Sequence, residues 1–302
     1  MAAFAGIVRF VTTRCAILVN NPSQCTVRLT VTNNCFAPDI LAMASQLSKI
    51  AIKDAMQKGS VWLKRPGTKE QRIRKSRFQL QTGDNISLFY DMQVLAKIPP
   101  LPQLVAREKN YSIWNKPAGL LTQGTRFGDH CSLLRYVEKE VDFCRTAKLV
   151  HRLDRQAQGL VVLAHNQRAA AALSSLFQSR EIEKRYWGVA RGRVGEIGDR
   201  LVCDTALDGK EAVTVVTVKD IVGVHDVSIL DILLQTGRKH QIRRHLSMLG
   251  HPLVGDTRYG HTRESEDLLL CACFLAFICP LTGKNRRYSI TPPSFPRQAV
   301  EI

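Results

Sequence analysis

The cysteines of this 302-residue chain lack the spacings on which structural metal sites are built. The nine cysteines are scattered, no Cys-x-x-Cys pair occurs, and no histidine stands at zinc-finger spacing. Structural zinc sites use closely spaced ligands, and disulfide frameworks belong to oxidising compartments. We therefore expect a reducing compartment and no bound metal.

Long apolar runs and phosphate-binding loops are also missing. The run LLLCACFLAFICP, residues 268–280, is far shorter than the roughly 18 residues that a membrane span needs. It predicts a buried strand and gives no reason to expect a membrane partner. No Gly-x-x-x-x-Gly-Lys-Ser/Thr loop for nucleotide phosphates occurs either.

Acidic residues are scarce. The chain has 43 Lys and Arg against 26 Asp and Glu, which gives a formal net charge of +17. Such an excess favours a polyanionic partner, although a generally basic surface would give the same count. The first 38 residues contain no Asp or Glu but do contain Arg9, Arg14 and Arg28. This composition leaves an unstructured extension, an upstream start or an organelle transit segment open.

Residues 38–92 carry a pattern of their own. Apolar residues at helical spacing up to Ala55, followed by Gly59, predict two short helices and then a strand. The stretch 64–77 has seven basic residues and one acidic residue, and the alternating stretch FQLQTGDNISLFY follows with a Gly83-Asp84 turn. One side of this small domain is therefore strongly positive, as a solvated loop or as a contact for nucleic acid.

The order of helix, helix, strand, basic loop and Gly-Asp turn resembles the S4-type RNA-binding module. The resemblance implies RNA contacts by Arg72, Arg74 and Lys75. We divide the chain accordingly into an N-terminal extension that need not be ordered, 1–36, an S4-like domain, 37–92, a Pro-rich linker, 93–106, and a catalytic domain, 107–302.

Asp154 is the first candidate catalytic residue. It lies in the stretch KLVHRLDRQAQGLVVLA, residues 148–164, in a loop between two apolar segments that predict strands. A second cluster, residues 233–260, predicts a strand, a turn, and a helix from about His240 to Leu249. Arg238 at the entry of that helix needs an acidic partner because the positive end of the helix dipole disfavours a cation. We expect Asp154 to be that partner, although a surface ion pair is the simpler interpretation of either residue alone.

The stretches HRLDRQAQGLVVLA, KRYWGVARG and TGRKHQIRRHLSMLGHPLVGDTRYG together resemble the RluA-type pseudouridine synthases. This resemblance implies an α+β fold with a mixed, largely antiparallel sheet flanked by helices. It also implies isomerisation of uridine to pseudouridine in RNA without a cofactor or a metal. Asp154 would be the catalytic carboxylate, Tyr186 would stack on the uracil, Arg238 would pair with Asp154, and Arg152 would help to displace the base. His151, Arg155, Lys116 and Gln241 are further candidates for RNA contacts.

Two departures from the family pattern leave substrate details open. After HRLD the family usually has an acidic or small residue and then Thr-Ser-Gly, whereas this chain has Gln156, Ala157 and Gln158 before Gly159. Cys271 stands where the family often has histidine. We expect an RNA partner, ribosomal RNA in preference to transfer RNA, and a monomer in the cytoplasm or alternatively the mitochondrial matrix. A catalytically silent RNA-binding or ribosome-assembly factor is the alternative. A hydrolase is disfavoured because the motifs supply arginine where a second acid or a metal would be needed.

Overall fold

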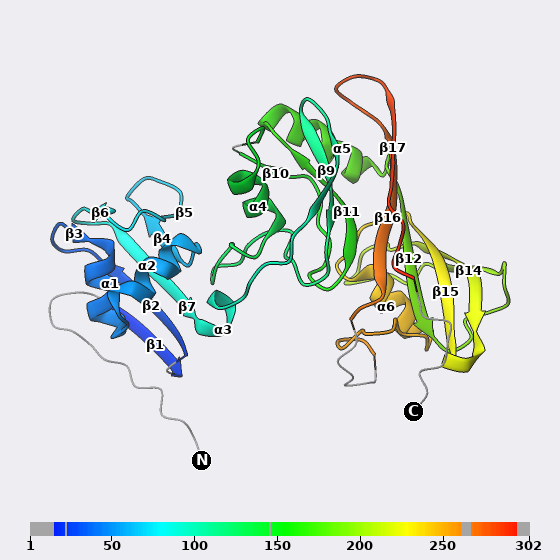
Figure 1. Cartoon of the computed structure of the whole chain (residues 1–302), viewed down its shortest axis with the longest axis horizontal. Helices are drawn as coiled ribbons and strands as arrows, with labels where there is room; N and C mark the ends of the chain where they lie inside the picture. The colour runs from blue at the N-terminus through cyan, green and yellow to red at the C-terminus, as the bar shows by residue number, and fades with distance from the viewer. Residues whose placement is uncertain (1–14, 22, 145, 261–266, 295–302) are drawn as a thin grey trace, which may run out of the picture. The chain divides into compact units, whose positions relative to one another are not determined.

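The computed structural model describes residues 15–21, 23–144, 146–260 and 267–294 (Figure 1). The chain forms two compact units, the first from residues 1–99 and 123–136, and the second from residues 100–122 and 137–302. The division after Pro99 falls inside the predicted linker, 93–106. That segment is more than a linker, because it contains most of the helix α3 (Met92–Leu95) and the strand β8 (Gln103–Arg107). The segment 123–136, which the sequence assigns to the catalytic domain, belongs to the first unit.

The first unit is built on a five-stranded antiparallel sheet with the order β1–β2–β7–β4–β5, and β3 pairs with β6 separately. The predicted extension, 1–36, is therefore not without structure, because β1 and β2 lie within it. Its first 14 residues lie outside the described residues. The elements are β1 (Cys15–Asn21), β2 (Gln24–Thr30), β3 (Cys35–Phe36), α1 (Ala37–Ser45), α2 (Lys49–Gln57), β4 (Val61–Lys64), β5 (Gln71–Arg72), β6 (Gln79–Leu80) and β7 (Asn85–Asp91).

The two predicted short helices are confirmed. Helix α2 begins after Ser48, whose side chain accepts a hydrogen bond from the amide of Ala51 and so satisfies one free donor of the first turn. The helix buries Ile52, Ala55 and Met56 in the core of the first unit.

The second unit contains a ten-stranded sheet. Eight strands follow the order β13–β14–β15–β12–β16–β11–β9–β8, while β10 pairs with β11 and β17 pairs with β16 outside this order. Only the β11–β16 pair is parallel among these ladders. The predicted mixed, largely antiparallel α+β fold is thus confirmed. The further elements are β9 (Tyr111–Lys116), α4 (Leu133–Glu140), β10 (Lys148–Leu149), β11 (Gln158–Ala164), α5 (Gln167–Ser179), β12 (Glu183–Arg191), β13 (Arg200–Cys203), β14 (Thr214–Val222), the 3-10 helix η1 (Gly223–His225), β15 (Val227–Leu234), α6 (Gln241–Met248), β16 (Leu270–Ile278) and β17 (Asn285–Ser289).

The core of the second unit lies between the sheet and α5. The side chain of Asn166 caps α5 by accepting from the amide of Ala169. Leu173 and Leu176 of α5 pack with Leu160 and Val162 of β11 in one apolar cluster. The apolar run 268–280 forms β16, which confirms the predicted buried strand. Among the described residues, no helix has the length and apolar character to cross a bilayer.

The centre of this sheet places the segment that carries Asp154 next to the strand that carries Tyr186. Ala272 of β16 pairs with Gly159 at the start of β11 on one side and with Tyr186 of β12 on the other. Gly159 has φ +117°, and a Cβ there would lie 2.4 Å from the carbonyl oxygen of Ala272. Only glycine therefore permits this close approach, which fixes where the Asp154 loop enters the sheet.

Candidate active site

A cavity of about 530 Å³ opens in the second unit. It is lined by the 150–157 loop, the end of α5, β12 and the start of α6. The predicted site residues Asp154, Tyr186, Arg152 and His151 all line it, as do Arg238 and Gln241. Residues far apart in the sequence thus meet at one cavity, as the motif analysis predicts.

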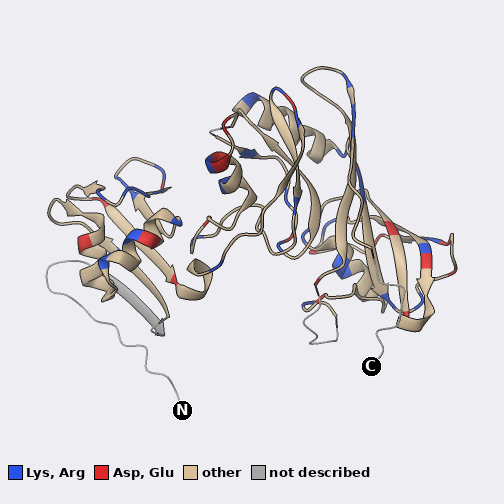
Figure 2. Ribbon diagram, viewed as in Figure 1, with Lys and Arg blue, Asp and Glu red and all other residues tan. Residues whose placement is uncertain are grey.

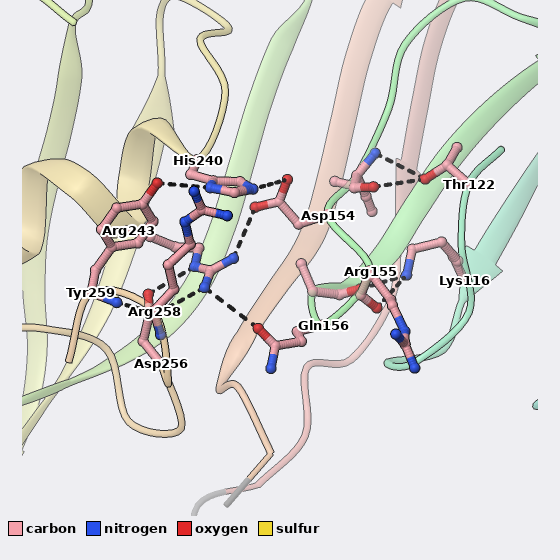
Figure 3. Close-up of polar contacts among 12 residues, drawn as sticks. Lys116, Thr122, Asp154, Arg155, Gln156, His240, Arg243, Asp256, Arg258 and Tyr259 are labelled. Carbon is pink, nitrogen blue, oxygen red and sulfur yellow. Dashed lines mark hydrogen bonds and ion pairs between the residues drawn. The ribbon is translucent and has the colours of Figure 1, made fainter. Parts of the chain in front are cut away.

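The carboxylate of Asp154 faces two cationic or polar side chains (Figure 3). Arg243 Nη1 lies 3.5 Å from Asp154 Oδ2, and His240 Nε2 lies 3.6 Å from Asp154 Oδ1. Thr122 holds the preceding residue, because its hydroxyl donates to the carbonyl of Leu153 at 2.8 Å and accepts from the amide of Leu153 at 3.2 Å. The loop is therefore tied on one side to the β9 turn and on the other to α6.

The predicted ion pair between Arg238 and Asp154 is wrong, because Arg243 occupies that position. Arg238 lies before the helix, and its Nε donates to the carbonyl of Glu211 at 2.8 Å. Helix α6 begins only at Gln241, so Arg243 lies inside the first turn, and its guanidinium also contacts the Asp154 loop through Gln156 Oε1 at 3.4 Å. No local signal in the sequence distinguishes Arg243 from Arg238, because the fold decides which of the two cations reaches the Asp154 loop, 89 positions away from Arg243.

Arg243 is anchored by Asp256. Its Nε and Nη2 each donate to one oxygen of Asp256 at 2.7 Å, and both side chains are almost fully buried. Burial alone would raise the pKa of Asp256, but the hydrogen bonds from Arg243 and from backbone amides outweigh it and lower the pKa. Asp256 also accepts from the amides of Arg258 and Tyr259, so it caps its own turn.

His240 contributes a feature that the sequence does not predict. Its φ is +53°, a left-handed conformation that is uncommon for residues other than glycine. Its Nδ1 lies 2.9 Å from the hydroxyl of Tyr259. Burial lowers the pKa of His240, against the opposing effect of the Asp154 carboxylate. A neutral imidazole held by Tyr259 on one nitrogen therefore faces Asp154 with the other.

Tyr186 lies on β12 in the wall of the same cavity, and burial, with a smaller contribution from Asp154, raises its pKa. Its phenol is thus protonated across the physiological range. The ring is nearly buried, with 9% of its surface exposed, which suits a residue that covers one side of a ligand.

Two predicted RNA contacts are wrong because the side chains are used within the protein. Lys116 is fully buried, and its Nζ donates to the carbonyls of Pro117 and Leu120, both at 2.9 Å, and of Ala157 at 2.6 Å. Gln241 accepts from Thr236 Oγ1 and from the amide of Arg238, and donates to Val213 O and Thr214 Oγ1. Both residues fasten the segments that frame the cavity.

His151, Arg152 and Arg155 differ in exposure. The ring of His151 stacks on Phe177 with 4.2 Å between centroids, and its Nε2 accepts from the amide of Val162 at 2.9 Å. Burial lowers the pKa of His151 to about 3, so the ring is neutral. Arg152 and Arg155 are exposed, and Arg155 Nε donates to the carbonyl of Gly119 at 3.3 Å. An RNA contact stays a prediction for these three residues.

In the first unit, two of the three predicted basic contacts lie against the segment 123–136. Arg72 donates to the carbonyl of Thr125 at 2.6 Å, and its guanidinium stacks on the ring of Trp62. Arg74 pairs with Asp129. Lys75 is exposed. Figure 2 shows basic residues around β4 and β5 of this unit. Contacts of Arg72, Arg74 and Lys75 with RNA stay a prediction.

The Cys271 position lies in the sheet. Cys271 is buried on β16, where it pairs with Gln158 and Trp187, which fits the predicted structural role. Within the residues that the structure describes, no group of three or more His, Cys, Asp or Glu side chains is arranged to hold a metal ion.

Comparisons with known proteins show to which family the chain belongs. A family model described as RNA pseudouridylate synthase matches residues 110–248. A dual-specificity RNA pseudouridine synthase RluA of Vibrio parahaemolyticus is 36% identical over 225 residues, which cover 67% of this chain and 88% of the relative. This chain belongs to the RluA-type RNA pseudouridine synthase family. Members of the family isomerise uridine in RNA to pseudouridine.

Other relatives of the synthase agree with this assignment. An uncharacterized RNA pseudouridine synthase of Chloroflexus aurantiacus is 34% identical over 201 residues, which cover 60% of this chain and 62% of the relative. The solved structure of human RNA pseudouridylate synthase domain containing 1 matches with a TM-score of 0.55 at 24% identity, over 65% of this chain and 87% of that chain. The structural likeness supports the fold of the synthase.

Proposed function

We propose that this synthase isomerises uridine in structured RNA with Asp154 as the catalytic carboxylate and Tyr186 as the residue that stacks on the uracil. The observation that carries the proposal is the position of the Asp154 carboxylate at the cavity that Tyr186 lines, between Arg243 and His240. Arg243 takes the role of orienting Asp154 that the sequence gives to Arg238.

The reaction needs only these groups and the substrate. The bond between C1′ and N1 breaks with its electron pair passing to the uracil, the carboxylate attacks the nucleoside or assists this departure, and the base turns. C5 then bonds to C1′, the proton on C5 is removed, and N1 gains a proton, so the product is an isomer of the substrate. A carboxylate that takes part in the exchange of the C1′–N1 bond for the C1′–C5 bond divides one difficult step into easier ones.

The target uridine must leave its stack to reach Asp154. Extrusion of a base costs a few kcal/mol, and enzymes offset it with inserted side chains and aromatic contacts. Arg152 is exposed, lines the cavity and is the residue that we assign to the RNA stack. His151, stacked on Phe177, also lines the cavity, and Arg155 follows on the exposed part of the same loop.

The identity of the substrate RNA is a separate proposal. The basic loop and the S4-like order of elements favour ribosomal RNA. Transfer RNA is the second candidate, because one relative is named a tRNA pseudouridine synthase C and others carry the name dual-specificity. The cytoplasm is the proposed compartment and the mitochondrial matrix the alternative, and we propose a monomer.

Pseudouridine mapping at single-nucleotide resolution tests the proposal. Total RNA from cells with the gene, without it, and with the Asp154→Asn variant is compared. We expect at least one uridine to lose its modification without the gene and with the variant, while the RNA affinity of the variant stays within a few fold. Asn keeps the size of the side chain and removes the charge. If every site persists without the gene, a silent RNA-binding factor becomes the better description.

A further inference from the structure

Lys184 is a buried cation in the wall of the catalytic cavity. It precedes Tyr186 by two residues on β12, and successive side chains of a strand alternate between faces, so the two side chains share one face. Lys184 is 8% exposed and lines the cavity together with Tyr186 and Asp154. A Cβ at Gly237 would lie 3.9 Å from Lys184 Nζ, so the ammonium lies near the turn that precedes α6.

In the part of the chain that the structure describes, no acidic group compensates the charge of Lys184. Among these residues, the side chain of Lys184 makes no hydrogen bond or ion pair, in contrast to Arg243 and Lys116 in the same unit. Its charged neighbour Arg180 is itself paired with Glu211. Burial, with a smaller contribution from Arg180, lowers the pKa of Lys184. Buried cations are normally paired, so an unpaired one in the wall of the cavity that Asp154 also lines is arranged for an electron-rich ligand.

The reaction supplies such a ligand. When the C1′–N1 bond breaks, the electron pair moves onto the uracil and its negative charge spreads over N1 and the two carbonyl oxygens. A fixed cation in a site that excludes water stabilises such developing charge strongly, because it needs no reorganisation. The exposed cations Arg152 and Lys239 also line the cavity, and their exposure suits phosphates of the RNA backbone. Lys184 is buried and stands beside the tyrosine assigned to the base.

We propose that Lys184 donates a hydrogen bond to a carbonyl oxygen of the extruded uracil and stabilises the negative charge that the ring carries after C1′–N1 cleavage. This inference rests on the proposed function, since it assigns a catalytic residue to the same reaction. It makes Lys184 a determinant of base recognition and of rate, and leaves the phosphates to the exposed cations.

The test compares Lys184→Met with Lys239→Met under single-turnover conditions on a short synthetic RNA that spans the mapped uridine. Both changes remove one positive charge from a residue that lines the cavity, but Lys239 is exposed. We expect Lys184→Met to lower the rate constant at saturating enzyme about 100- to 1000-fold, with RNA affinity within a few fold. Lys239→Met should chiefly weaken RNA binding. A Lys184→Met variant that weakens binding but keeps the rate would assign the ammonium to a phosphate and overturn the proposal, as would an unchanged variant.

Folding is checked by thermal unfolding. Because Lys184→Met replaces an uncompensated buried charge by an apolar chain of similar length, we expect an equal or higher Tm together with the lost activity. If Lys184→Met does not fold, Lys184→Gln replaces it in the same comparison. A wild-type protein without activity on the RNA would refute the proposed function, whereas full activity of a folded variant would refute only the role of Lys184.

Substrates with sulfur in place of one carbonyl oxygen identify the contact. The wild type and Lys184→Met are compared on RNAs that carry 2-thiouridine or 4-thiouridine at the target. Sulfur is a weaker hydrogen-bond acceptor, so the analogue that changes the contacted atom should lower the rate of the wild type and affect the variant much less. If both analogues slow the two proteins by the same factors, Lys184 does not bind a uracil carbonyl and the proposal fails.

Discussion

Arg243 contacts two carboxylates, and the two contacts differ in strength. Its two hydrogen bonds to Asp256 are 2.7 Å long, whereas Asp154 Oδ2 lies at 3.5 Å. The strong pair therefore fixes the guanidinium, and the fixed guanidinium orients the weaker-held carboxylate. This division leaves Asp154 free to move toward a substrate, while a fully paired Asp154 would have to break strong hydrogen bonds before it could react.

The fork of Arg243 is thus the feature on which orientation depends. Arg243→Lys keeps the positive charge but cannot hold both oxygens of Asp256 and reach Asp154 at once. We expect kcat to fall about 100-fold, the order of loss that a small misplacement of a catalytic group causes. Steady-state kinetics on an RNA that contains the mapped target uridine measures kcat, and near-ultraviolet circular dichroism checks that the variant keeps its side-chain packing. A variant with wild-type kcat would show that charge alone is sufficient.

The matched control for Arg243 is Arg244. The neighbouring side chain is paired with Asp208 on the exposed side of α6, with Nη1 2.9 Å from Asp208 Oδ2. Arg244→Lys is therefore expected to leave stability and kcat close to the wild-type values, as is usual for exposed pairs. Loss of activity in this control would indicate that α6 as a whole, and not the shared guanidinium, governs the site.

At the scale of elements, Lys116 joins two segments that meet only in the folded state. Its ammonium at the end of β9 binds carbonyls of the following turn and the carbonyl of Ala157 in the loop after Asp154. Burial lowers the pKa of Lys116 to about 7, with Asp154 acting in the opposite direction. Lys116 thus holds the shape of the Asp154 loop although its own side chain does not line the cavity.

Lys116→Met should destabilise the fold, because it leaves several buried carbonyl oxygens without donors. We expect a loss of about 2–4 kcal/mol in the free energy of unfolding, measured by urea titration. Arg155→Ala is the control, since Arg155 joins the same two segments through a single exposed bond to Gly119 and should cost less than about 1 kcal/mol. Equal losses for the two variants would contradict the assigned role of Lys116.

The elements show where sequence reasoning succeeds. A continuous apolar run predicts β16 and helical apolar spacing predicts the α2 region, because burial is decided there by the local sequence. A period-two alternation was also present in Cys25, Val27 and Leu29 of β2, inside the stretch assigned to an extension. Ion-pair partners are harder to predict from the sequence. Arg243 lies 89 positions from Asp154, and nothing local distinguishes it from Arg238. The assignment of Lys116 and Gln241 to RNA missed their burial, because distant segments of the chain cover these two residues.

At the scale of the whole molecule, the net charge of +17 divides into cations that serve the fold and cations that are free for RNA. In the first unit, Arg72 and Arg74 bind the segment 123–136, which returns to this unit from the chain after β9. Lys75 and Arg77 in the same basic stretch are exposed. A phosphate contact releases counterions only if the cation reaches the RNA, so the exposed pair should carry the salt dependence.

The double variant Lys75→Gln/Arg77→Gln separates these two groups. We expect it to weaken RNA binding and to reduce the slope of log affinity against log salt by about 2, close to one for each lost phosphate contact, with stability unchanged. Arg72→Gln/Arg74→Gln removes the same charge but should lower the stability of the first unit, because Asp129 then stays buried without its partners. Binding measured across a salt series, beside urea unfolding, checks both. If the first variant keeps the wild-type slope, the basic loop is only solvated, and the RNA must be held by cations of the second unit.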